Sequence, residues 1–144
     1  MENGMFDENV KMGPILYDAK IGLWQIEMDE GEPGRMYADR AMLELLGLEE
    51  TPTPQECYNH WHSRIGEGSL GLVEGAVQTM AAGQHGEISY PWYHPIKGKT
   101  YVRCGGTRDM DYTKGLRFHG YHQDISEIVS LQKETEKLRG FQET

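Results

Sequence analysis

The stretch GLRFHGYHQDISEIVSLQKETEKL, from Gly115 to Leu138, decides the architecture of the chain because its hydrophobic period changes in the middle. Up to Asp124, apolar and polar residues alternate, which is typical of a half-buried strand. From Ile125 onward, the apolar residues are spaced by three and four positions, which is typical of a helix. The sequence therefore predicts a strand that leads directly into a mostly polar helix.

Asp124 lies where the period changes, and Glu127 follows three residues later. An aspartate in this position, with a glutamate at that spacing, has the chemistry of a helix N-cap with a capping-box partner. We predict that this joint couples the strand to the helix. The joint consists of Asp124, Ile125, Ser126 and Glu127. The seam of the helix consists of Ile128, Leu131, Thr135 and Leu138. A threonine within such a seam predicts a weak coiled coil.

Length and composition limit the class of protein. With 144 residues, the chain can form one domain with a core and a helical extension. Its formal charge of −9 argues against binding to nucleic acid or to an anionic membrane. No apolar run approaches the ~20 residues that span a bilayer, and the first ten residues lack the pattern of a secretory signal. Two cysteines form no recognisable framework, and a cytoplasmic location would keep them reduced.

The remaining segments alternate between strand and helix patterns. Strands are expected over 22–28, 35–38, 84–94 and 100–108, and helices over 40–46 and 69–82. Thr53, Pro54 and Glu56 form the clearest helix start, with a threonine N-cap, proline at N1 and glutamate at N3. Pro91 cannot donate a backbone hydrogen bond, so its strand is expected at a sheet edge or with a bulge.

Two motifs resemble the PAS family of sensor domains. The run GYHQDISE, from Gly120 to Glu127, resembles the G-x-x-x-D-I-T-E ending of that family. The run HPIKGKTYVR, from His94 to Arg103, is similar to its R-x-D-G-x-x-R-W-V-R hairpin. The resemblance implies an α+β fold: a five-stranded antiparallel sheet in the order 2-1-5-4-3, helices on one face, and a C-terminal exit helix. It implies a lead-in segment over 1–18, the PAS domain over 19–127 and a signalling helix over 128–144.

In the resembled family, helices wall a ligand cavity. From the inward strand parity and the apolar helix stripes, we predict the residues that line it here. They are Trp24, Leu45, Trp61, Val73, Val77, Val102, Phe118 and Gly120. Gly120 is expected to leave space on a central strand. An aromatic cage for a cation is conceivable with Trp24, Trp61, Tyr90 and Trp92. Core packing is the commoner role of aromatic residues at such spacing.

Cofactor motifs of the resembled family do not match. A haem-binding member would need a histidine on the long helix, and residues 69–82 contain none. A flavin photosensor would need Asn-Cys-Arg-Phe-Leu-Gln, whereas Cys57 lies in Glu-Cys-Tyr-Asn-His. The histidine spacings also match no metal-site pattern. We therefore predict neither haem, flavin nor metal, and we expect the purified protein to be colourless.

The resemblance implies a cytoplasmic sensory module of a larger signal-transduction protein, either a two-component histidine kinase or a GGDEF diguanylate cyclase. Such a module would bind a small molecule or a partner and act on a covalently linked output domain through the exit helix. It would form a homodimer through that helix or through the N-terminal segment. The alternative is a ligand-free dimerisation or scaffold module with a filled core, and an enzyme is the third choice. A cavity between sheet and helices would favour the sensor.

Overall fold

The computed structural model describes residues 12–143, with side chains from 14 to 140. In chain order, its elements are α1 (Met12–Asp18), β1 (Ile21–Asp29), β2 (Arg35–Ala38), α2 (Arg40–Leu45), α3 (Pro54–His62), α4 (Leu70–Ala81), β3 (Gly86–His94), β4 (Gly98–Arg108), β5 (Gly115–Asp124) and α5 (Ser126–Glu143). The strands form one five-stranded sheet in the order β2-β1-β5-β4-β3, and neighbouring strands are antiparallel. The predicted fold class and strand order are confirmed.

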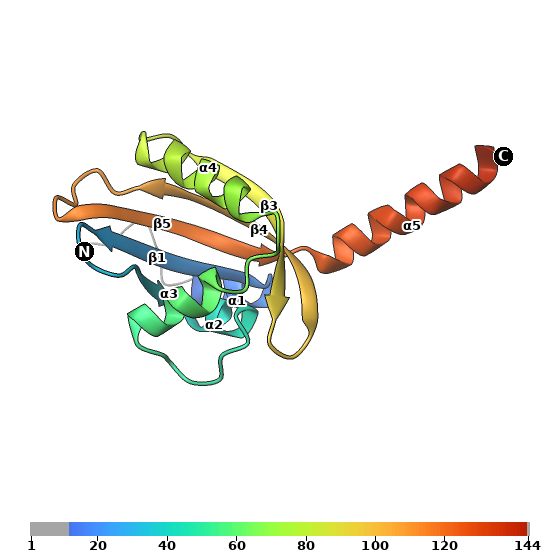
Figure 1. Cartoon of the computed structure of the whole chain (residues 1–144). Helices are drawn as coiled ribbons and strands as arrows, with labels where there is room; N and C mark the ends of the chain where they lie inside the picture. Colours follow the sequence, from blue (N-terminus) through green and yellow to red (C-terminus); the bar gives the residue numbers. More distant parts are fainter. Residues whose placement is uncertain (1–11, 144) are drawn as a thin grey trace.

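The change of period at Asp124 corresponds to the end of β5 and the start of α5. Strand β5 lies at the centre of the sheet, where Phe118 pairs with Ile26 and Gly120 with Trp24 of β1. Helices α2, α3 and α4 contribute to the same core cluster as the inward side chains of the sheet, so they pack on one face. Helix α5 instead extends away from the domain (Figure 1). Within residues 12–143, no helix is both long and apolar enough to cross a membrane.

Local chemistry fixes the ends of the helices that pack on the sheet. The Thr53 hydroxyl accepts from the Glu56 N–H at 3.2 Å, and the Glu56 carboxylate accepts from the Thr53 N–H at 2.9 Å. This capping box was predicted and is confirmed. Asp39 caps α2 by accepting from the Met42 N–H at 2.9 Å. Gly47 follows α2 with φ of +72°, a conformation that favours glycine at a helix end.

Pro91 lies on β3, which is an edge strand as predicted. The segment after α3 covers part of this edge. The Gly66 N–H donates to the Pro91 carbonyl, and the Tyr93 N–H donates to the Arg64 carbonyl, both at 2.9 Å. These bonds satisfy backbone groups that an uncovered edge would expose. They also hold the end of α3 against the sheet.

The outer face of the sheet, opposite the helices, buries the carboxylate of Glu27, which is only 5% exposed. Arg35 Nη2 lies 2.9 Å from Glu27 Oε1, and Arg117 Nη2 lies 2.6 Å from Glu27 Oε2. Burial raises the pKa of Glu27, but the hydrogen bonds from the two arginines outweigh it and the net pKa is lowered. This face is therefore stabilised by an ionised network.

Candidate functional site

A cavity of about 350 Å³ lies between α3, α4 and the inner face of the sheet. Its lining comprises Trp24, Ile26, Met28, Tyr58, Trp61, His62, Leu70, Val73, Glu74, Ala76, Val77, Gln78, Met80, Ile88, Cys104 and Phe118. Five of the eight predicted pocket residues belong to this set: Trp24, Trp61, Val73, Val77 and Phe118. Trp24 and Phe118 share one face of the sheet, so the predicted register is correct.

Three predicted pocket residues do not line the cavity. Gly120 does not provide space for a ligand, because a side chain there would meet the Trp24 indole and the Gly105 carbonyl. The Trp24 ring, which is on the neighbouring strand, therefore fills the space above the glycine. Val102 is buried in the core, and Leu45 packs against the core from α2. Both are inward-facing, as predicted, but they lie away from the cavity.

The cavity is apolar and aromatic inside and polar at its opening. Trp24, Trp61 and Phe118 are buried, whereas His62, Glu74 and Gln78 are exposed. Among the described residues, no Lys or Arg side chain lines the cavity. Glu74 is the one acidic side chain that the described residues contribute to this lining. This lining suits an apolar molecule better than an anionic one.

The lining does not fit the haem or the flavin considered from the sequence. A haem propionate or a flavin phosphate needs a cationic partner, and this cavity offers the carboxylate of Glu74 instead. Cys57 is buried in α3 but does not line the cavity, and burial raises the pKa of its thiol to about 11. Cys104 lines the cavity from β4, and burial raises its pKa to about 12. Both cysteines are thus neutral thiols near pH 7.

A buried polar cluster adjoins the cavity through Trp61. Trp61 Nε1 donates to the Tyr90 hydroxyl at 2.9 Å, and that hydroxyl lies 2.8 Å from His122 Nε2. Because the hydroxyl accepts from Trp61, the arrangement assigns its proton to the bond with His122. Tyr90 is 2% exposed and His122 is 3% exposed. Burial lowers the pKa of His122 to about 3 and raises that of Tyr90 well above 10.

The cluster was not identified from the sequence as a unit. The alternation along β5 is the signal that could have found it, since His122 has the same parity as Phe118 and Gly120. Two buried polar atoms beside the cluster, Trp24 Nε1 and His122 Nδ1, have no hydrogen-bond partner within the described part of the chain. The two rings meet edge to face, with centroids 6.1 Å apart. The inner face therefore buries neutral polar groups with few partners.

The joint between β5 and α5 has three hydrogen bonds. The Asp124 carboxylate accepts from the Ser126 N–H at 2.9 Å. The Ile125 N–H donates to the Tyr101 carbonyl at 2.8 Å, and the Tyr101 N–H donates to Ser126 Oγ at 3.0 Å. The Ile125 carbonyl accepts from the Val129 N–H at 2.9 Å, so Ile125 occupies the N-cap position and Asp124 precedes it. Among the described residues, Glu127 forms no bond back to Asp124, so the predicted N-cap with its capping box is wrong. The start of α5 is held instead by Tyr101 of β4, which bonds directly to Ile125 and Ser126.

The predicted seam of α5 is exposed along its length. Ile128, Leu131, Thr135 and Leu138 are all open to solvent. The Thr135 hydroxyl donates to the Leu131 carbonyl one turn earlier, at 2.9 Å. Near the base of the helix, Lys133 Nζ lies 5.2 Å from the Tyr101 ring centroid. Tyr101 thus contacts both the joint and the helix that leaves it.

No protein-family model and no curated protein matches the sequence. Solved structures do match. A sensory box histidine kinase/response regulator from Burkholderia thailandensis has a TM-score of 0.64 at 18% identity, covering 88% of this chain and 96% of that chain. The N-terminal domain of a diguanylate cyclase with PAS/PAC sensor from Marinobacter aquaeolei has a TM-score of 0.56 at 20% identity, covering 74% and 95%. A light-oxygen-voltage domain studied with a flavin analogue has a TM-score of 0.57 at 15% identity, covering 95% and 99%.

These likenesses extend over most of the chain, and they agree with the strand order and with the helix that follows the last strand. The chain therefore has the PAS fold.

Proposed function

We propose that the chain is a cytoplasmic sensory module that binds a small molecule in the cavity between α3, α4 and the sheet. It passes a conformational change through α5 to a covalently linked output domain, of the histidine kinase or diguanylate cyclase type. The cavity of about 350 Å³ is the observation that carries this proposal. A scaffold module with a filled core would have no need of such a space, whereas ligand pockets usually measure ~300–1,000 Å³.

The polar cluster supports a route from the cavity to the exit helix. Trp61 lines the cavity and bonds to Tyr90, which bonds to His122 on β5. His122 lies two residues before Asp124, whose carboxylate accepts from the first N–H of α5. A ligand that shifts the Trp61 indole would change the bonding of β5 close to the joint. The ligand needs only a different affinity for two arrangements of this strand to act on α5.

Thermal melting against a panel of small apolar compounds tests the binding step. A compound that binds the folded chain raises its melting temperature by an amount that grows with the logarithm of its concentration relative to its Kd. Val77→Trp places a large ring in the cavity, so the shift should disappear in this variant. Leu72→Trp is the matched control, since Leu72 is exposed on the same helix and does not line the cavity. Equal shifts in wild type and Val77→Trp would contradict binding in the cavity.

We also propose that α5 pairs with the same helix of a second copy. The support is the exposed row of Ile128, Leu131 and Leu138 on a helix that leaves the domain (Figure 1). Three apolar positions and one threonine predict a weak dimer. Sedimentation equilibrium should show self-association at high concentration that Leu131→Glu abolishes. Glu134→Gln, elsewhere on the helix, is the control, and association that survives Leu131→Glu would rule out this seam.

A further inference from the structure

We infer that the cavity selects an organic cation with an apolar body, such as an amine or a quaternary ammonium compound. This inference rests on the proposal that the cavity binds a small molecule, and it names the chemical class of that molecule. It follows from the aromatic lining, the sign of the charge at the opening and the size of the cavity.

Four aromatic side chains line the cavity: Trp24, Tyr58, Trp61 and Phe118. Aromatic faces attract cations through the ring quadrupole, and the attraction strengthens where water is excluded. Trp61 and Tyr58 meet edge to face with centroids 5.6 Å apart, and the Trp61 N–H is held by Tyr90. The rings are thus fixed before a ligand arrives. Only two members of the cage considered from the sequence take part, because Tyr90 and Trp92 do not line the cavity.

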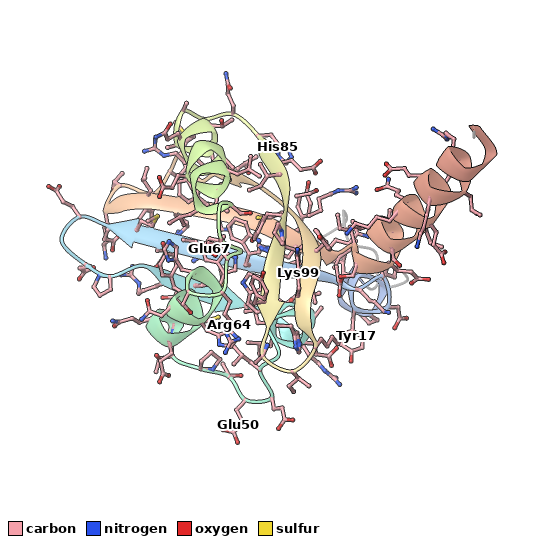
Figure 2. All side chains as sticks on the ribbon, turned by 45° about the vertical axis from the view of Figure 1, so that its right-hand side comes forward. Tyr17, Glu50, Arg64, Glu67, His85 and Lys99 are labelled. Atoms are coloured by element: carbon pink, nitrogen blue, oxygen red, sulfur yellow. The ribbon has the colours of Figure 1, made fainter. Side chains whose placement is uncertain are left out.

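The charge at the opening is negative. Glu74 follows Val73 on α4 and is exposed, so its carboxylate can meet the head of a ligand without a large desolvation cost. The cations nearest in sequence are engaged elsewhere. Arg64, just after α3 and the nearest cationic residue to Glu74 in the sequence, donates to the Tyr93 carbonyl at 3.2 Å (Figure 2). Arg108 on β4 donates to the Ala81 carbonyl at the end of α4, at 2.8 Å. An anion in the cavity would face Glu74 with no Lys or Arg among the described lining residues to offset that charge.

The remaining lining residues determine the chemistry and size of the apolar part of the ligand. Ile26, Val73, Val77 and Met80 present hydrocarbon and thioether groups to the cavity. A volume of about 350 Å³ admits a benzyl or short alkyl group together with a substituted ammonium head. The whole chain, with its formal charge of −9, also favours the approach of a cation.

Three probes of matched shape test this inference by calorimetric titration of the chain at pH 8. They are benzyltrimethylammonium, its neutral carbon isostere neopentylbenzene, and the anion phenylmethanesulfonate. We expect the cation to bind about tenfold more tightly than the neutral isostere, since a cation over desolvated aromatic rings gains a free energy of that order. The anion should show no measurable binding.

The Glu74→Gln variant should weaken cation binding about threefold and leave the neutral probe unchanged. Glu67→Gln is the matched control, because Glu67 is an exposed carboxylate just before α4 that does not line the cavity (Figure 2). Equal affinities for the cation and its isostere would overturn the inference while leaving the cavity as a binding site. Equal effects of the two glutamine variants would overturn the role of Glu74. A compound panel that gives no shift sensitive to Val77→Trp would instead overturn the proposed function itself.

Discussion

Each face of the sheet buries a titratable side chain within a hydrogen-bonded cluster, and the two clusters stabilise that side chain in opposite ways. On the outer face, Glu27 is ionised and bonded to Arg35 and Arg117. On the inner face, His122 is neutral and bonded to the Tyr90 phenol. The difference follows from access to water. The two arginines are 24% and 29% exposed, so they remain partly hydrated, whereas Tyr90 and His122 are almost completely buried.

A substitution in the inner cluster should reduce the free energy of unfolding more than one in the outer network. Tyr90→Phe removes the one hydroxyl that serves both Trp61 and His122. Two buried polar groups would then lack a partner, so we expect the free energy of unfolding to fall by about 3 kcal/mol. Urea unfolding measures this loss. Tyr93→Phe on the same strand is the control, since Tyr93 is exposed and its change should stay within ~0.5 kcal/mol. A similar small effect of Tyr90→Phe would show that the cluster does not stabilise the core.

The two faces should also respond to acid in different pH windows. The pKa of His122 is about 3 in the fold, against an ordinary value of ~6.5, so the unfolded chain binds more protons in between. The contribution of neutral His122 to the free energy of unfolding is complete above pH ~6.5. It falls as pH decreases, with a loss of about 2 kcal/mol at pH 5. Glu27 has a lowered pKa, so its contribution is lost only below its ordinary value of ~4.3.

Urea unfolding at pH 7.5 and pH 5 measures the contribution of His122. The difference in the free energy of unfolding between the two pH values should be smaller in His122→Phe than in wild type. Some difference will remain, because burial also lowers the pKa of His94. The titratable groups that face His122 are Tyr90 and Cys104, and Cys104 is the residue opposite His122 on β4. Both have raised pKa values and stay neutral throughout this range. An NMR titration of wild type that detects a charged His122 at pH 5 would contradict the assignment directly.

Glu27→Gln should have a smaller effect than Tyr90→Phe, although it removes a buried charge. Arg35 retains Asp29 at 2.9 Å, and Arg117 retains Asp109 at 3.4 Å. Both guanidinium groups can also be hydrated, so we expect a loss of about 1.5 kcal/mol in urea unfolding at pH 7. Glu32→Gln is the control, because that exposed carboxylate contacts Arg35 at 3.2 Å and no bond to Arg117 is found for it among the described residues. A loss greater than that of Tyr90→Phe would reverse the comparison between the faces.

The sequence predicted the features that depend on local chemistry and on parity. The alternation of β5, the capping box at Thr53 and the edge position of Pro91 each follow from a few neighbouring residues. Parity also placed Trp24 and Phe118 on one face. It could not show that the Trp24 indole lies over Gly120, since that depends on the side-chain direction of a neighbouring strand.

The boundaries of the cavity depend on tertiary packing in the same way. Parity and helix stripes identify inward-facing side chains, but they do not separate those that pack closely from those that border a space. Val102 is therefore in the core and Val77 at the cavity, although strand parity for the first and the helix stripe for the second predicted both as pocket residues. Likewise, the capping partner expected for Asp124 was a residue three positions ahead, whereas the bonds that hold this joint come from Tyr101 on a distant strand.

Asp124 should show the smallest effect on stability and the most local effect on structure. It is half-buried at the end of the strand that carries His122, and its carboxylate accepts one N–H at the favourable end of the α5 dipole. Loss of one side-chain bond to the start of a helix costs about 1 kcal/mol, a small part of the ~5–15 kcal/mol that holds a domain together. Because Tyr101 still holds Ile125 and Ser126 in Asp124→Ala, the domain should melt within a few degrees of wild type.

The first turns of α5 should nevertheless exchange their amide hydrogens about fivefold faster in Asp124→Ala. Loss of a bond worth ~1 kcal/mol lowers the free energy of opening that end of the helix by this amount. Hydrogen exchange over residues 125–138, recorded beside a thermal melt, separates the two effects. Glu127→Ala is the matched control, because Glu127 is exposed in the same turn and does not cap the helix in this structure. If α5 is faster in Asp124→Ala and unchanged in Glu127→Ala, the carboxylate itself anchors the exit helix. If protection is unchanged in both variants, the bonds from Tyr101 carry the joint alone, and any signal from the cavity must reach α5 through β4 instead of through Asp124.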